Sequence, residues 1–239
     1  MTAGVPYERL RGFIARAFER AGVPAADAFT VASLMAEADL QGSDGHGVIR
    51  LPQYLRRIRA GGINVRPAIR VERERAGIAL IDGDNALGHL VMKRAAEVAI
   101  AKARVAGVAW VGAHRSNHAG PASLYARMPL AADMIGLYFA VGNANHLPPW
   151  GGLDMLLSTN PIAAAIPARD EAPIVLDMAT TVAAYGKVKA KAARGARSRI
   201  RSARKRASCC PSAATRGMAS RSSWGSSRAL SMAPRWAAT

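Results

Sequence analysis

A short stretch of the chain, SDGHGVIR at residues 43–50, places a hydroxyl, an imidazole and a guanidinium three and four residues apart. An imidazole can transfer protons near neutral pH, and a guanidinium can bind an anion. If a helix begins here with Ser43 or its neighbour as N-cap, then Ser43, His46 and Arg50 share one face. The glycines on both sides of His46 weaken a helix, which is easier to accept where backbone or a ligand must come close to the imidazole. The stretch therefore fits either a ligand-binding face or a solvated helix start.

The other reactive residue types argue against several kinds of site. His114 and His118 form an H-x3-H pair that could bind zinc on a helix, but no third ligand follows at a useful spacing. Cys209 and Cys210 are adjacent and suggest neither a disulfide framework nor a metal site. The dinucleotide fingerprint GxGxxG and the phosphate loop GxxxxGKS/T are both absent from the sequence. A nucleotide would have to bind by another route, and no metal site is predicted.

Apolar periodicity predicts the elements that must position these residues. The predicted helices cover residues 7–21, 24–40, 51–60, 88–106 and 119–132, and a further helix begins at residue 180. The predicted strands lie within residues 78–88, 108–112, 135–141, 162–167 and 174–178, and the run at 108–112 is of the buried type. Strands that alternate with helices predict an α/β fold with a mixed sheet. We expect an N-terminal helical segment at residues 1–75, an α/β domain at 76–195 and a basic tail at 196–239.

The net charge of +17 is concentrated at one end of the chain. Of the 33 lysines and arginines, 14 follow residue 186, which leaves 19 basic against 16 acidic residues before that point. The last acidic residue is Asp177. A protein that binds nucleic acid through this tail is the alternative class, although nothing resembles an RNP motif or a zinc finger. Such binding would depend steeply on salt and would vanish with the tail, and we regard a nucleic-acid partner as the weaker hypothesis.

Sequence features also bear on the compartment. No N-terminal run combines a basic start with the apolar core of a secretion signal. The longest apolar run, IGLYFAV, is far shorter than the about 20 residues that a membrane-spanning helix needs. We expect a cytoplasmic protein without membrane contact.

Five motifs in order resemble those of one enzyme family. They read SDGHGVIRLPQYLRRIRAGGI, SNHAGPASLYA, PPWGG, STNPIAAAIP and LDMATTVAAYGKV. Together they are similar to the malate/L-lactate dehydrogenase family with a non-Rossmann NAD(P) fold, over residues 7–194 or so. The resemblance implies hydride transfer between NAD or NADP and C2 of a small 2-hydroxy or 2-oxo acid. It also implies a homodimer for the full-length protein and an NAD(P)-binding role for the α/β domain.

The resemblance also assigns roles to residues. Arg50 would bind the substrate carboxylate in a two-toothed contact, and Ser43 and Asn117 would complete the substrate site. His118 and His46 are the two candidates for the proton carrier, with His118 placed first. The cofactor-facing residues would be Asn143, Ala144, Thr159, Asn160, Leu176, Asp177, Met178, Ala179 and Thr180. Several relatives carry serine where Ala144 stands, and His89 and His146 are expected to be structural.

The resemblance stops where the tail begins, and the genetic code relates the tail to the family. Relatives continue through a segment of the type LLPxGGxKGxGLALxVxxLAG. Leu-Leu-Pro-Ile-Gly in GC-rich codons, read one base later, gives Cys-Cys-Pro-Ser-Ala, the sequence of residues 209–213. The same shift reproduces residues 219–227 from a Gly-Leu-Ala-Leu segment. We therefore predict a frameshift between Arg194 and Cys209, a disordered tail and an enzyme impaired in this form. The DNA frame beneath residues 209–239 should then stay open past codon 239.

Overall fold

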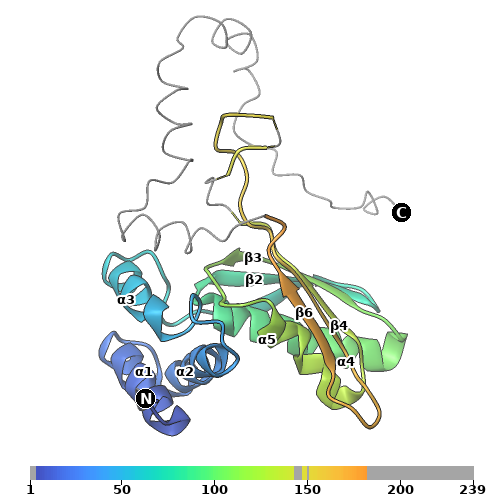
Figure 1. Cartoon of the computed structure of the whole chain (residues 1–239), viewed down its shortest axis with the longest axis horizontal. Helices are drawn as coiled ribbons and strands as arrows, with labels where there is room; N and C mark the ends of the chain where they lie inside the picture. Colours follow the sequence, from blue (N-terminus) through green and yellow to red (C-terminus); the bar gives the residue numbers. More distant parts are fainter. Residues whose placement is uncertain (1–3, 143–146, 150, 182–239) are drawn as a thin grey trace, which may run out of the picture.

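The computed structural model of the chain describes residues 4–142, 147–149 and 151–181 (Figure 1). Its α-helices are α1 (Tyr7–Arg20), α2 (Ala25–Leu40), α3 (Leu51–Arg59), α4 (Gly88–Ala106) and α5 (Ser123–Ala126). Two 3-10 turns cover Val48–Arg50 and Met128–Ala132. Among the described residues no helix is both long and apolar enough to cross a membrane. The predicted basic tail and the predicted helix from residue 180 onward fall almost wholly outside these ranges.

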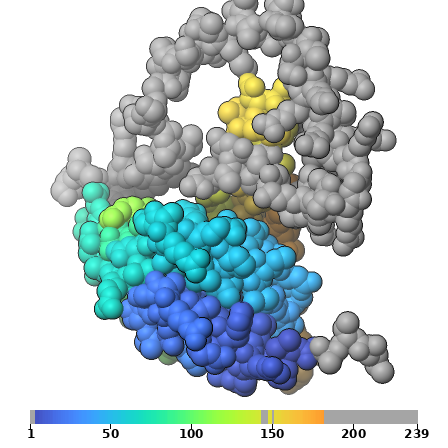
Figure 2. Space-filling view, turned by 90° about the vertical axis from the view of Figure 1, so that its left-hand side faces the viewer, coloured from blue at the N-terminus to red at the C-terminus, as the bar shows by residue number. Residues whose placement is uncertain are grey.

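The first three helices pack around one apolar core. Ile14 and Phe18 of α1 are four residues apart and face Val31 and Met35 of α2, all with no exposed surface. Tyr54 of α3 closes this core and is nearly as deeply buried. Figure 2 shows these helices, coloured blue to cyan, as a continuous surface. The helices predicted over residues 7–21, 24–40 and 51–60 are confirmed to within about two residues at each end.

Two three-stranded sheets, together with α4 and α5, follow the three helices in the described chain. The first contains β1 (Arg70–Glu74), β2 (Ile78–Ala86) and β3 (Trp110–Ser116), with β1 antiparallel and β3 parallel to β2. The second contains β4 (Gly136–Phe139), β5 (Ile162–Ile166) and β6 (Ile174–Met178), all antiparallel. The parallel pair is connected through α4, as such a crossover requires. The predicted α/β class with a mixed sheet is confirmed.

Two predicted elements need correction. The helix expected over residues 119–132 is only the short α5 followed by a 3-10 turn, because Pro129 has no amide hydrogen to continue an α-helix. The strand expected at 108–112 is β3, which begins two residues later, at Trp110. Trp110 is mostly exposed, and β3 is not the buried strand that the sequence predicts. The charged strand β1 gave no apolar signal and was not predicted. The predicted domain boundaries remain predictions.

The stretch at residues 43–50 is also not the helix that spacing suggested. It forms a turn, in which the His46 amide donates to the Ser43 carbonyl at 2.8 Å, and then the 3-10 turn that leads into α3. Asp39 at the end of α2 holds this loop, since its Oδ2 accepts from the Val48 amide at 2.8 Å. A Cβ at position 47 would lie 2.0 Å from Asp39 Oδ1, so only glycine permits the approach.

We predict that Gly47→Ala lowers the free energy of unfolding by about 1–3 kcal/mol, since the added methyl group displaces the Asp39 carboxylate from the loop. Urea denaturation of the purified chain measures this. Gly45→Ala is the matched control, because nothing lies within 4 Å of a Cβ at position 45. We expect its effect to stay within about 0.5 kcal/mol. Equal losses of unfolding free energy in both variants would show that the contact between the Asp39 carboxylate and the loop does not require glycine at position 47.

Candidate active site

Two imidazoles from distant parts of the sequence lie against each other. His46 comes from the loop between α2 and α3, and His118 follows β3. Their ring centroids are 5.6 Å apart and their planes differ by 9°, which is a parallel stack. The loop after α2 and the segment after β3 therefore bring together the two residues that the sequence predicts as proton carriers.

The hydrogen bonds of His118 identify which ring nitrogen carries its proton. Tyr54 Oη lies 2.5 Å from His118 Nδ1. The Gly120 amide donates to the same nitrogen at 3.3 Å, from a glycine whose φ of +82° suits the tight turn. An N–H that points at Nδ1 requires an acceptor there, so neutral His118 carries its hydrogen on Nε2 and Tyr54 donates to Nδ1.

Both stacked histidines are held in the neutral form. Desolvation by the surrounding protein lowers the pKa of His118 to about 4; the positive charge of Arg50 acts in the same direction, as do His46 in its protonated form and Arg57. Desolvation also lowers the pKa of His46, with Arg50 adding to the effect and the Asp177 carboxylate opposing it. Part of His118 remains open to solvent. The pair is therefore accessible, uncharged and flanked by one cation and one anion.

Arg50 is fixed by its own loop and by α3. Its Nε donates to the Gly45 carbonyl at 2.6 Å, and its Nη1 donates to Gln53 Oε1 at 3.0 Å. A guanidinium has five N–H groups, so three remain for a ligand beyond these bonds within the described chain. Tyr54 lies one helical turn after Arg50, which brings both side chains toward the histidine pair. Ser43 contributes its backbone carbonyl, which accepts a hydrogen bond from the His46 amide.

Asp177 of β6 connects the second sheet to the histidines. Its Oδ2 accepts a hydrogen bond from the Ser123 amide at 2.8 Å, and its negative charge acts to raise the pKa of His46. The neighbours of Asp177 in β6, Leu176 and Met178, alternate to the opposite face of the strand. A ligand on the Asp177 side would therefore meet only their backbone.

The other residues predicted to face a cofactor lie at the ends of β5 and β6. Thr180 donates from its amide to the Thr159 carbonyl at 2.9 Å and from its hydroxyl at 3.1 Å. Asn160, at a φ of +37°, accepts from the Gly142 amide at 3.0 Å through Oδ1. Ala179 is half-buried between Met178 and Thr180. Asn143, Ala144 and His146 lie outside the described residues.

These strand ends have the donors and acceptors that a nicotinamide dinucleotide needs. The Oδ1 of Asp177 and the Nδ2 of Asn160 make no hydrogen bond within the described residues. A carboxylate oxygen accepts from ribose hydroxyls, and an amide can bind the nicotinamide carboxamide. The residues present fit the cofactor that the sequence predicts, at the side of β6 that faces His46.

The structure bears on two further predictions. The amide of Asn117 donates to Asn85 and to the Ala86 carbonyl, at 2.9–3.0 Å, so it holds the segment after β3 onto the end of β2. A substrate role for Asn117 stays a prediction. His114 lies on β3 and contacts Glu72 at 2.6 Å, so the H-x3-H pair is not on a helix and its members have different partners.

Sequence reasoning missed Tyr54 and understated His89. Tyr54 is predicted only as part of an amphipathic helix, although its spacing from Arg50 was the available signal. His89 is fully buried, lies edge-on to Tyr54 with centroids 5.7 Å apart, and has no hydrogen-bond partner at either ring nitrogen within the described residues. His89 packs against Tyr54 from the protein interior, and no spacing pattern in the sequence predicts this contact.

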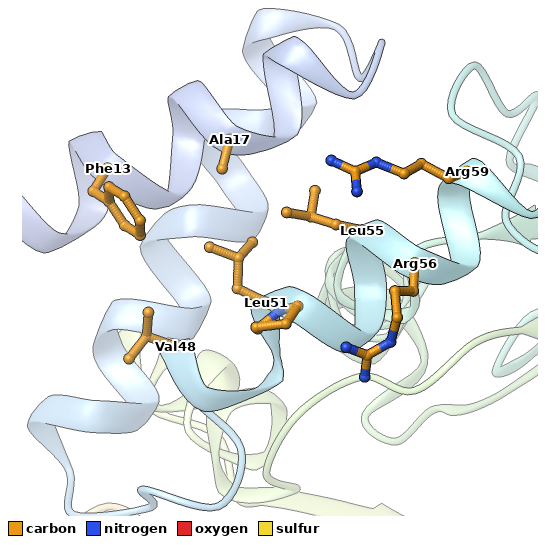
Figure 3. A pocket seen from close by; sticks show the side chains of 8 residues that line it. Phe13, Ala17, Val48, Leu51, Leu55, Arg56 and Arg59 are labelled. Carbon is orange, nitrogen blue, oxygen red and sulfur yellow. The ribbon is translucent and has the colours of Figure 1, made fainter.

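A hollow of about 550 Å³ lies elsewhere, between α1 and α3 (Figure 3). Apolar side chains line it, and two arginines lie on its α3 side. Its lining is Phe13, Ala17, Val48, Leu51, Pro52, Leu55, Arg56 and Arg59. None of the predicted site residues contributes to it, so it is separate from the histidine pair.

Comparison with known proteins decides the family. The sequence profile of malate/L-lactate dehydrogenase matches residues 5–200. The chain belongs to the malate/L-lactate dehydrogenase family. It is 46% identical over 185 residues to malate dehydrogenase from Pyrococcus horikoshii, covering 77% of this chain and 51% of that protein. It is 36% identical over 181 residues to ureidoglycolate dehydrogenase (NAD(+)) from Escherichia coli strain K12, covering 76% of this chain and 52% of that protein.

Solved structures of the family agree with the fold. The structure of the Pyrococcus horikoshii malate dehydrogenase superposes with a TM-score of 0.74 at 44% identity, covering 78% of this chain and 53% of that chain. The chain thus spans about half the length of the relatives it matches. All the predicted site residues fall inside the part that matches the malate/L-lactate dehydrogenase family.

Burial of His89 leads to a prediction about stability and pH. Desolvation, together with His118 and His46, lowers the pKa of His89 to about 3. A histidine in the unfolded chain has a pKa of about 6.5. Between the two pKa values the unfolded chain therefore binds a proton at His89 that the folded chain does not bind. The free energy of unfolding attributable to His89 therefore falls as pH falls, by about 2 kcal/mol between pH 7.5 and pH 5.

Urea unfolding at the two pH values measures this effect. We expect His89→Leu to lose about 2 kcal/mol of the pH dependence relative to the parent chain. Subtracting the pH dependence of the His89→Leu variant from that of the parent chain removes the contributions of the titratable groups that the two proteins share. The same pH dependence in both proteins would contradict a neutral buried His89.

Proposed function

We propose that the chain carries the substrate site and part of the cofactor site of an oxidoreductase that transfers a hydride between NAD or NADP and C2 of a small 2-hydroxy or 2-oxo acid. The observation that supports this best is the stacked pair of His46 and His118 beside Arg50 and Asp177. Relatives named malate dehydrogenase and ureidoglycolate dehydrogenase (NAD(+)) belong to the same family and act on such acids by name. A homodimer, which the resemblance implies for the full-length protein, is part of the proposal.

Substrate binding in this proposal begins at Arg50. The guanidinium binds the carboxylate through N–H groups that its loop leaves unused. The carboxylate cancels the positive charge that helps to lower the pKa of His118, so the pKa of His118 rises when substrate binds. Substrate thus favours protonation of the histidine that must supply a proton.

Proton transfer then uses Nε2 of His118. A nicotinamide bound beside β6 would supply the hydride to C2 of the oxo acid or accept it from the hydroxy acid. In reduction, protonated His118 donates its Nε2 proton to the C2 oxygen as negative charge develops there. The Tyr54 hydroxyl serves both states of the ring, because it donates to Nδ1 in the neutral form and accepts from Nδ1–H in the cation, where the 3.3 Å bond from the Gly120 amide is lost. His46, stacked on His118, excludes water and fixes the ring plane.

The test uses a frame-restored protein, because the family chain is about twice as long as the matched part. We expect it to oxidise NADH or NADPH when pyruvate, oxaloacetate or glyoxylate is the acceptor, followed by loss of cofactor absorbance. The 239-residue chain should show little or no turnover. A folded, frame-restored protein that oxidised neither cofactor with any of these acids would refute the proposed function.

A further inference from the structure

One peptide group in the turn after His118 is hydrogen-bonded at both of its ends. The group joins Ala119 to Gly120. Its N–H, on Gly120, donates to His118 Nδ1 at 3.3 Å. Its C=O, on Ala119, accepts from the hydroxyl of Tyr125 in α5. Among the described residues no backbone amide donates to this carbonyl, so the Tyr125 hydroxyl supplies the bond that fixes it.

The two bonds are linked because the peptide group is planar and trans. In a trans peptide the C=O and the N–H point in opposite directions, and the described chain has no cis peptide bond. A phenol that holds the Ala119 carbonyl on one side therefore directs the Gly120 N–H to the other side, toward His118. Hydrogen bonding at the carbonyl also polarises the amide and strengthens its N–H as a donor.

Glycine at position 120 makes the orientation of this peptide adjustable. Gly120 has a φ of +82°, and glycine populates positive and negative φ about equally well. The peptide plane can therefore turn over at little cost when its carbonyl is not held. A larger residue would not fit, because a Cβ at position 120 would lie 3.1 Å from His89 Nε2. The orientation of the peptide thus depends on the hydrogen bonds at its two ends.

Tyr125 is itself held firmly enough to fix the carbonyl. Its side chain is buried and stacks on Tyr138 of β4, with ring centroids 5.4 Å apart. It packs in the same apolar cluster as Ala38 of α2. The start of α5 is held in turn by Asp177, whose carboxylate accepts from the Ser123 amide. Burial raises the pKa of Tyr125 well above its usual range, so the hydroxyl keeps its hydrogen and remains a donor.

We propose that Tyr125 is a positioning residue, which places the hydrogen of neutral His118 on Nε2 by orienting the peptide between residues 119 and 120. Tyr54 lies 2.5 Å from Nδ1 but cannot make this choice, since a hydroxyl both donates and accepts. An amide N–H only donates, and it requires a nitrogen without hydrogen. The catalytic meaning rests on the proposed function, in which the Nε2 hydrogen faces the C2 oxygen of the oxo acid.

Nitrogen NMR of the 239-residue chain, labelled with 15N-histidine, tests this proposal without substrate. An imidazole nitrogen without a hydrogen resonates far from one that carries it, so the spectrum of the neutral ring reports the tautomer. The His118 signals are identified by their loss in His118→Ala. We expect the Nε2–H form to dominate in the parent chain. In Tyr125→Phe the ratio of Nδ1–H to Nε2–H should rise about 2- to 10-fold, the worth of one hydrogen bond.

Two matched tyrosine-to-phenylalanine variants separate orientation from packing. Tyr138→Phe removes the hydroxyl of the stacked neighbour, which makes no hydrogen bond to the turn within the described residues, and should leave the tautomer of His118 unchanged. Tyr54→Phe should keep the Nε2–H form, because the Gly120 N–H still requires a bare Nδ1. The pKa of His118, followed by the same signals, should rise in Tyr125→Phe, where the cation no longer faces a fixed N–H. It should fall in Tyr54→Phe, where the cation loses its acceptor.

Each outcome bears directly on the positioning role. A parent chain whose neutral His118 carries its hydrogen on Nδ1 overturns the proposal before any variant is made. An unchanged tautomer ratio and pKa of His118 in Tyr125→Phe, with the fold intact by circular dichroism, also overturns it. An equal change in Tyr138→Phe would assign the effect to packing and overturn it as well. None of these measurements needs turnover, so failure of this proposal and failure of the proposed function are told apart.

Discussion

His118→Ala is expected to lower kcat of the frame-restored protein by about 10²–10⁴-fold, the largest effect predicted for any single residue here. The reason is the hydrogen-bond pattern at Nδ1, where Tyr54 and Gly120 leave Nε2 to exchange a proton with the substrate oxygen. Without an imidazole, water must serve this role in a site that lacks a fixed donor. Steady-state kinetics with a 2-oxo acid and NADH or NADPH measures the loss.

His46→Ala is the matched comparison, because His46 is the other ring of the stack. We expect it to act mainly on KM, since His46 packs on His118 and its ring makes no hydrogen bond within the described residues that would fix its proton. Tyr54→Phe should shift the pH profile of kcat, because it removes the group that accepts from Nδ1–H in the cation. If His46→Ala lowered kcat as much as His118→Ala did and left KM unchanged, the assignment of the proton to His118 would be wrong.

Most of the fold could be predicted because its elements have strong local signals. The helix at Gly88–Ala106 is predicted to the residue, since its apolar spacing ends at Gly107, which adopts a left-handed φ of +79°. The strands β5 and β6 follow from short apolar runs between turns. The charged strand β1 could not be found this way, because it is stabilised by pairing with β2 and carries no apolar pattern.

The sequence predicts which residues form the site, but it does not predict how they lie. The family motifs predict roles for His46, Arg50 and His118, which stay predictions, and the structure shows that the two histidines lie together. The spacing argument for a shared helical face was wrong, because the loop depends on Asp39, which lies earlier in the chain and gives no periodic signal. Tyr54 was missed for a similar reason: its contact with His118 crosses 64 residues of sequence.

The two faces of β6 show a further limit of sequence reasoning. The motif LDM is predicted to face the cofactor as a unit, yet strand alternation places Asp177 on the side toward His46 and its two neighbours, Leu176 and Met178, on the opposite, exposed face. A family motif predicts one shared role for a run of neighbouring residues. Only the strand geometry shows which of three consecutive residues lies on the side of His46.

Arg50→Lys is expected to raise KM for the oxo acid about 10- to 100-fold in the frame-restored protein, equal to about 1.4–2.7 kcal/mol, with little change in cofactor affinity. Arg50 holds its plane by bonds from Nε to Gly45 and from Nη1 to Gln53, and it still has N–H groups for a carboxylate. A lysine ammonium keeps the charge, but it cannot make both internal bonds and present a planar pair of donors as well.

The control for this substitution comes from the same helix. Arg56→Lys changes the same residue type in α3, but Arg56 lines the separate hollow against α1 (Figure 3). We expect KM to stay within about twofold there, since a surface charge far from the substrate contributes little. An unaltered KM in Arg50→Lys would mean that the loop at residues 43–50 does not bind the substrate carboxylate. The proton-uptake argument would then fail as well, because it requires the carboxylate to cancel the charge of Arg50 beside His118.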